Sequence, residues 1–81
     1  MVSPRPKKVE ALDDYILYIL FDNGEEKLYD MKKNLEFKFY ERLKNRELFK
    51  KVRPDGINIA WETGEDIDPD ELYINSIEYK G

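Results

Sequence analysis

The 81-residue sequence contains no cysteine and no histidine. Without cysteine it can form no disulfide framework, zinc–thiolate site or cysteine nucleophile. Without histidine it lacks the usual serine triad, imidazole metal ligands and the side chain that ordinarily titrates near neutral pH. The only hydroxyl groups besides those of tyrosine belong to Ser3, Thr63 and Ser76, and none has an imidazole to activate it. We therefore expect no enzymatic activity, no cofactor and no bound metal.

Glycine and long apolar runs are scarce as well. The four glycines are isolated from one another, so the chain has no glycine-rich loop for a phosphate group. The longest apolar run, Tyr15–Phe21, is much shorter than the roughly 20 residues of a membrane helix. The N-terminal segment, residues 1–8, is basic but is followed by no apolar stretch, unlike a signal peptide. These features predict a cytoplasmic protein that does not contact a membrane.

The residues that are abundant point to a folded domain. Hydrophobic residues make up 41% of the chain, aromatic residues 14% and charged residues 40%, against a usual charged share of about a quarter. Disordered chains combine high charge with few aromatic residues, and this chain does not. Its length allows one domain. We place that domain at residues 6–77, with a flexible N-terminal tail at residues 1–5 and a C-terminal tail at residues 78–81.

Turn residues divide the chain into short strands. Asn23-Gly24 is a strong hairpin signal, because both central turn positions need positive φ. It joins Tyr15–Phe21, which is apolar throughout as a central strand covered on both faces would be, to residues 26–31. Asp13-Asp14 forms the turn that precedes this strand, and residues 8–12 form the strand before that turn. Asp55-Gly56 joins residues 51–53 to residues 57–61, in which Ile57, Ile59 and Trp61 face the core, and a short segment follows at residues 65–67.

Two helices have recognisable starts. Asn45 is a good N-cap for a helix over residues 46–51, with Leu48, Phe49 and Val52 on its buried face. A second helix starts with Asp68 as cap, Pro69 at the first position and Glu71 as in a capping box, and its apolar stripe consists of Leu72, Tyr73 and Ile77.

The apolar residues of segment 32–44 follow no sustained helical or strand period. We therefore predict a short helical turn plus an ordered loop there. The fold class is therefore α+β, an antiparallel sheet of two β-meanders with one or two short helices packed on it.

One acidic segment has the spacing of a calcium loop. Asp66, Asp68 and Asp70 stand at its first, third and fifth positions. The loop would then need glycine at the sixth position and glutamate at the twelfth, where this chain has Glu71 and Ile77. Helix capping explains the segment without an ion, and we favour it.

The charges are segregated along the chain. Residues 32–53 carry nine basic and three acidic residues, a local net charge of +6, whereas residues 55–81 carry eight acidic residues and one basic residue, a net charge of −7. Aromatic residues Phe37, Phe39, Tyr40 and Phe49 are interleaved with the basic ones. Such a basic segment either binds a nucleic-acid backbone and stacks bases, or is a solvated face with its aromatic rings in the core. We favour the solvated face, because the domain is acidic overall. Trp61 is either the centre of the core or an interface anchor, and we favour the core.

The same asymmetry also suits a protein partner of complementary charge. A protein-interaction domain is our leading hypothesis, and a nucleic-acid-binding regulator that uses the basic segment from Lys32 to Arg53 is the alternative. The candidate partner-binding residues are Lys38, Tyr40, Arg42, Arg46, Lys50 and Lys51.

Several segments together resemble a known family. They are residues 9–15, Phe21-Asp22-Asn23-Gly24-Glu25, residues 48–52, Ile59-Ala60-Trp61 and residues 64–73 with Asp-Ile-Asp-Pro-Asp-Glu-Leu-Tyr. From about Pro6 to Asn75 the chain resembles the prokaryotic domain-of-unknown-function family numbered 2442. The resemblance implies a small α+β domain without assigned catalytic residues. It also implies an antitoxin-like partner role, because members often lie beside genes of a family numbered 4160, in an arrangement similar to toxin–antitoxin pairs.

Overall fold

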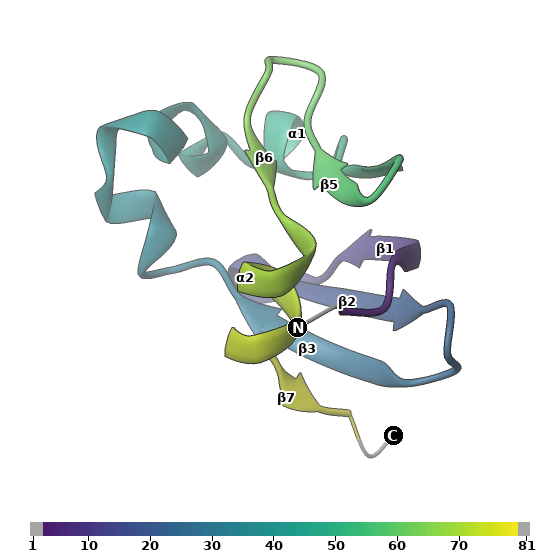
Figure 1. The fold of residues 1–81 in the computed structure, drawn as a ribbon. Coiled ribbons are helices and arrows are strands. Elements are labelled where there is room, and N and C mark those ends of the chain that lie inside the picture. The colour runs from purple at the N-terminus through teal and green to yellow at the C-terminus, as the bar shows by residue number, and fades with distance from the viewer. Residues whose placement is uncertain (1–2, 80–81) are drawn as a thin grey trace.

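The computed structural model describes residues 3–79, in which strands alternate with short helices (Figure 1). The strands are β1 (Pro6–Ala11), β2 (Ile16–Phe21), β3 (Glu26–Asp30), β4 (Arg53–Asp55), β5 (Asn58–Ala60), β6 (Asp66–Ile67) and β7 (Ile77–Glu78). The helices are α1 (Arg46–Phe49) and α2 (Pro69–Asn75), with 3₁₀ turns η1 (Asp13–Tyr15), η2 (Asn34–Glu36) and η3 (Lys38–Lys44). The predicted α+β class is confirmed. Among residues 3–79, no helix is long and apolar enough to cross a membrane.

The larger sheet is antiparallel, with strand order β1-β2-β3-β7. The predicted turn at Asn23-Gly24 joins β2 to β3, and Gly24 adopts a φ of +90°, which favours glycine. Asn23, however, does not have the positive φ predicted for it, and the Gly24 backbone N–H donates to the Phe21 oxygen at 3.0 Å. Burial alternates along β2, so that Leu17, Ile19 and Phe21 are fully buried while the opposite face is half-buried. The prediction of a strand covered on both faces was therefore right for one face only. On the second face the Tyr18 ring packs edge-on against Tyr79, which is itself 41% exposed and leaves this face half-buried.

The smaller sheet has the order β4-β5-β6, so the two predicted meanders form two separate sheets. Ile59 and Trp61 point into the core as expected. Ile57 does not, because it lies in the turn after Gly56 rather than in β5, and its side chain is 47% exposed. The first strand of this meander also starts later than predicted, at Arg53.

Trp61 lies in the core, which answers the question left open by the sequence. Its side chain is 2% exposed, and its indole Nε1 donates to the backbone oxygen of Phe49 at 2.9 Å. The Phe49 and Trp61 rings stack with centroids 6.2 Å apart. Trp61 therefore attaches the end of α1 to the smaller sheet.

Both predicted helix caps are present. Asn45 Oδ1 accepts from the Glu47 backbone N–H at 2.9 Å, although α1 ends at Phe49, before the predicted residue 51. Asp68 Oδ1 accepts from the Glu71 backbone N–H at 2.8 Å and starts α2. The Glu71 side chain, predicted to complete a capping box, accepts from the Asn75 amide instead. The predicted apolar stripe of α2 is wrong at Ile77, which belongs to β7 and is 67% exposed.

Residues on both sides of the predicted 6–77 boundaries also take part in the fold. The Ser3 hydroxyl is buried and donates to Asp70 at 2.6 Å. In β7, Glu78 pairs with Lys27, and the Tyr79 backbone N–H donates to the Glu26 oxygen at 3.0 Å. Residues 1–2 and 80–81, the outer parts of the two predicted tails, lie outside the described residues.

Candidate partner-binding surface

The segment between β3 and α1 carries two exposed phenylalanines. It folds as η2 and η3, in agreement with the predicted helical turn and ordered loop, and in Figure 1 it extends to one side of the sheets. Leu35 and Leu43 are buried and fix its two ends to the core. Between them Phe37 is 66% exposed and Phe39 is 59% exposed. The prediction that the aromatic rings of this segment lie in the core is therefore wrong for these two residues, whereas Phe49 is buried as predicted.

Tyr40 holds the segment against the smaller sheet. It is half-buried, and its hydroxyl donates to the Asp66 backbone oxygen at 2.9 Å. Burial raises the pKa of Tyr40 to about 12, and the charge of Asp66 acts in the same direction. The ring of Phe39 packs edge-on against Tyr40, with centroids 4.8 Å apart. The Phe39 ring is thus exposed to solvent on one side and packs on the other against Tyr40, which is held by its hydrogen bond to Asp66.

Of the predicted cationic residues, the structure brings two next to these rings. Lys38 and Arg42 line a shallow hollow of about 420 Å³ together with Phe39 and Glu41. The Arg42 Nε lies 3.9 Å from a carboxylate oxygen of the buried Glu65. We use the name Phe37–Arg42 surface for the exposed side chains of this segment, namely Phe37, Lys38, Phe39 and Arg42.

The other predicted cations lie on or just after α1. Arg46 Nη2 is 3.4 Å from the Asp13 carboxylate, and its guanidinium lies 5.5 Å from the centre of the Tyr15 ring. Lys50 and Lys51 follow the last turn of α1 and are exposed. Arg46 therefore ties α1 to η1, while the two lysines extend into solvent.

The three aspartates with calcium-loop spacing serve three different hydrogen bonds. Asp68 caps α2, Asp70 accepts from Ser3, and Asp66 Oδ2 lies 3.5 Å from the Asn58 side-chain amide. Within the described range 3–79, no three acidic side chains gather as a metal site would require. The capping explanation of this segment is supported by the geometry.

The hydroxyl side chains also have structural partners. Ser3 donates to Asp70, Thr63 to the Glu65 carboxylate, and Ser76 to the Tyr73 backbone oxygen at 3.1 Å. Each hydroxyl thus closes a turn or joins two segments.

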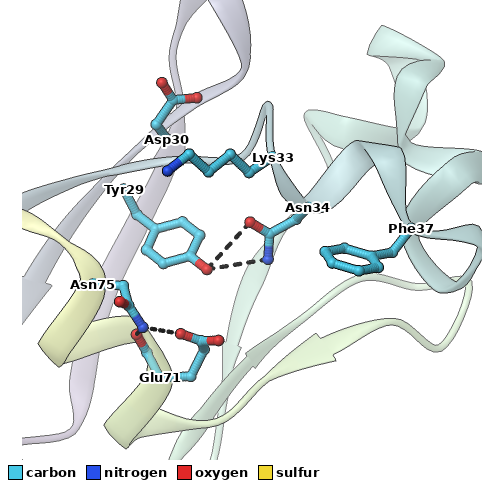
Figure 2. Close-up of a pocket in the computed structure, with 7 residues that line it drawn as sticks. All are labelled: Tyr29, Asp30, Lys33, Asn34, Phe37, Glu71 and Asn75. Carbon is cyan, nitrogen blue, oxygen red and sulfur yellow. Dashed lines mark hydrogen bonds between the residues drawn. The ribbon is translucent and has the colours of Figure 1, made fainter.

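A second hollow, which the sequence did not indicate, adjoins the Phe37–Arg42 surface. It measures about 430 Å³ and is lined by Tyr29, Asp30, Lys33, Asn34, Phe37, Glu71 and Asn75 (Figure 2). We call it the Tyr29–Glu71 cavity. The Asn34 amide nitrogen donates to the Tyr29 hydroxyl at 3.1 Å, and burial raises the pKa of Tyr29. No local pattern could reveal this cavity, because one wall comes from residues 29–37 and the other from α2, which is distant from them in the sequence.

Comparison with known proteins yields a family but no characterised relative. No curated protein and no solved structure matches the chain. One family model, described as "Protein of unknown function (DUF2442)", matches residues 6–78. That range covers both sheets, both helices and the Phe37–Arg42 surface. The chain therefore belongs to the DUF2442 family.

Proposed function

We propose that the chain is a non-enzymatic, cytoplasmic protein-interaction domain that binds its partner through the Phe37–Arg42 surface. The observation that carries this proposal is the exposure of Phe37 and Phe39 on a segment fixed at both ends by Leu35 and Leu43. Burying a phenylalanine side chain is worth about 1.5–3 kcal/mol. A partner that covered both exposed rings would therefore gain this free energy of burial for each ring, and the complex would be stabilised accordingly.

The surroundings of the two rings also suit an interface. Interface centres are enriched in aromatic residues and arginine, with polar groups at the rim. Here Lys38 and Arg42 flank Phe39, so an acidic rim on a partner would be complementary. Because the segment is already ordered, little conformational entropy would be lost when a partner docks.

We further propose that the partner is the protein encoded by the adjacent gene, which the chain would bind in an antitoxin-like manner. This part rests on the gene neighbourhood that the family resemblance implies, and on the charge segregation of the sequence.

Co-expression with that adjacent gene tests the proposal. The two proteins should co-elute in size-exclusion chromatography, and Phe39→Ser should weaken the complex at least roughly tenfold in calorimetric titration, as for an interface hot spot. Ile77→Ser is the matched control, because Ile77 is similarly exposed but lies on β7 of the larger sheet. A complex that Phe39→Ser leaves unchanged contradicts the assigned surface, and the absence of any complex contradicts the proposed partner.

A second candidate function is binding of single-stranded nucleic acid. The exposed rings of Phe37 and Phe39 on either side of Lys38 favour it, because bases stack on aromatic rings beside a basic groove. Titration of a single-stranded oligonucleotide at two salt concentrations should then show affinity that falls steeply with salt. No binding at low salt would exclude this candidate.

A further inference from the structure

The Tyr29–Glu71 cavity contains a carboxylate without a cationic partner. In the part of the chain that the structure describes, Glu71 forms no ion pair, and its carboxylate accepts a hydrogen bond only from the Asn75 amide. The other acid of the cavity, Asp30, forms an ion pair with Lys32 at 3.2 Å, and Lys32 also pairs with Asp14. Figure 2 shows the Glu71 carboxylate on α2 below the Tyr29 hydroxyl, with Asn34 and Phe37 to the right of that hydroxyl.

The surroundings make this side of the cavity electronegative. The charges of Asp68 and Glu71 act on the Tyr29 hydroxyl, and those of Asp66 and Glu71 on the Tyr40 hydroxyl, in each case raising the pKa of the phenol. The one cation of the wall, Lys33, lies next to Asp30 in Figure 2, across Tyr29 from Glu71. A cationic guest beside Glu71 would therefore be attracted, and it would not meet the Lys33 ammonium directly.

We propose that this cavity receives an arginine side chain of the protein partner. The guanidinium donates to the Glu71 carboxylate and lies against the Phe37 ring. Arginine fits better than lysine, because its planar group bonds a carboxylate with two parallel N–H groups and stacks on an aromatic face. The inference rests on the proposed function and deepens it: Phe37 borders both the cavity and the Phe37–Arg42 surface, so one partner could occupy both.

A titration of the isolated chain tests the cavity without any partner. The probes are N-acetyl-arginine methylamide, the lysine analogue, and the citrulline analogue, which has nearly the shape of arginine but no charge. Backbone amide NMR should show saturable shifts at Asn34, Phe37 and Asn75 with the arginine probe at millimolar concentration. We expect the lysine probe to bind more weakly, and the citrulline probe roughly tenfold more weakly.

Two variants complete the experiment. Glu71→Gln keeps the backbone N–H that donates to Asp68 but removes the side-chain charge. It should weaken binding of the arginine probe roughly tenfold. Glu36→Gln removes an exposed acid of η2 outside the cavity, and it should leave binding unchanged. Phe37→Leu keeps an apolar side chain without the aromatic face, and it should weaken the arginine probe more than the citrulline probe.

Equal binding of arginine and citrulline, or an equal loss in Glu71→Gln and Glu36→Gln, would overturn the proposal. So would shifts that avoid the cavity. These outcomes leave the Phe39→Ser test of the proposed function untouched, because that test uses the partner complex and a residue outside the cavity. Conversely, arginine binding by a chain that forms no partner complex would contradict the proposed function, and with it the partner as the source of the arginine, but not the binding of a guanidinium by the cavity.

Discussion

Replacing Trp61 with phenylalanine should remove a large part of the stability of this domain. The indole Nε1–H is the hydrogen-bond donor to the Phe49 backbone oxygen at 2.9 Å, inside the core. Phenylalanine has no N–H, so this buried oxygen at the end of α1 loses its donor. The shorter ring also leaves a gap beside Phe49, against which Trp61 stacks.

The magnitude follows from these two losses. A buried polar group that loses its partner costs about 1–3 kcal/mol. The missing ring atoms remove apolar contacts worth about 1 kcal/mol more. The total, about 2–4 kcal/mol, is large beside the roughly 4–12 kcal/mol expected for a folded chain of 81 residues.

Urea unfolding measured by circular dichroism checks this prediction, since the variant has no tryptophan for fluorescence. The midpoint should fall with little change in the slope. Phe37→Leu is the control: its exposed position predicts a change within about 0.5 kcal/mol. A loss below about 0.5 kcal/mol in Trp61→Phe would show that neither the hydrogen bond nor the packing of Trp61 contributes as described.

Three further predictions concern the turns and caps. Asp68→Ala removes the acceptor of the Glu71 backbone N–H, and it should lower the free energy of unfolding by about 1 kcal/mol in urea titration. Gly24→Ala should cost about 1 kcal/mol by the same assay, because alanine is strained at a φ of +90° although its Cβ would meet no atom within 4 Å; an unchanged midpoint would refute the assigned turn. The Tyr73 hydroxyl donates to Glu25 and lowers its pKa, so this carboxylate stabilises the fold above its ordinary pKa, and the contribution is lost as pH falls through the lowered value. Tyr73→Phe should therefore raise the pKa of Glu25 in a carboxyl-carbon NMR titration.

The features that were predicted correctly are those whose causes are local. The hairpin turn at Asn23-Gly24 depends only on residues next to it, although Asn23 lacks the predicted positive φ. The Asp68 cap needs only the N–H groups of the next turn. Strand β7 was not predicted, because it is only two residues long and forms by pairing with Lys27 and Leu28, which are far from it in the sequence. A pairing of this kind leaves no local pattern in the sequence.

The candidate surface was predicted in part, for a related reason. The sequence singled out the basic segment, and Lys38 and Arg42 do lie beside an exposed ring. It could not decide which aromatic residues are exposed, because residues 34–44 have no regular period. In this segment, whether an aromatic side chain is buried or exposed depends on how Leu35 and Leu43 anchor the segment in the core. The Tyr29–Glu71 cavity depends on contacts between distant elements and had no signal at all.

The late position of β7 has a consequence for synthesis on the ribosome. Strands β1, β2 and β3 are neighbours along the chain and can pair as soon as they emerge, whereas β7 must wait until α2 has been made. The Ser3–Asp70 hydrogen bond, which spans 67 positions, must wait as well. Until then the backbone of Lys27 and Leu28 is an open strand edge, and such edges can pair with the wrong chain. Synthesis of β7, rather than formation of the first hairpin, is thus the step that covers the open edge of β3.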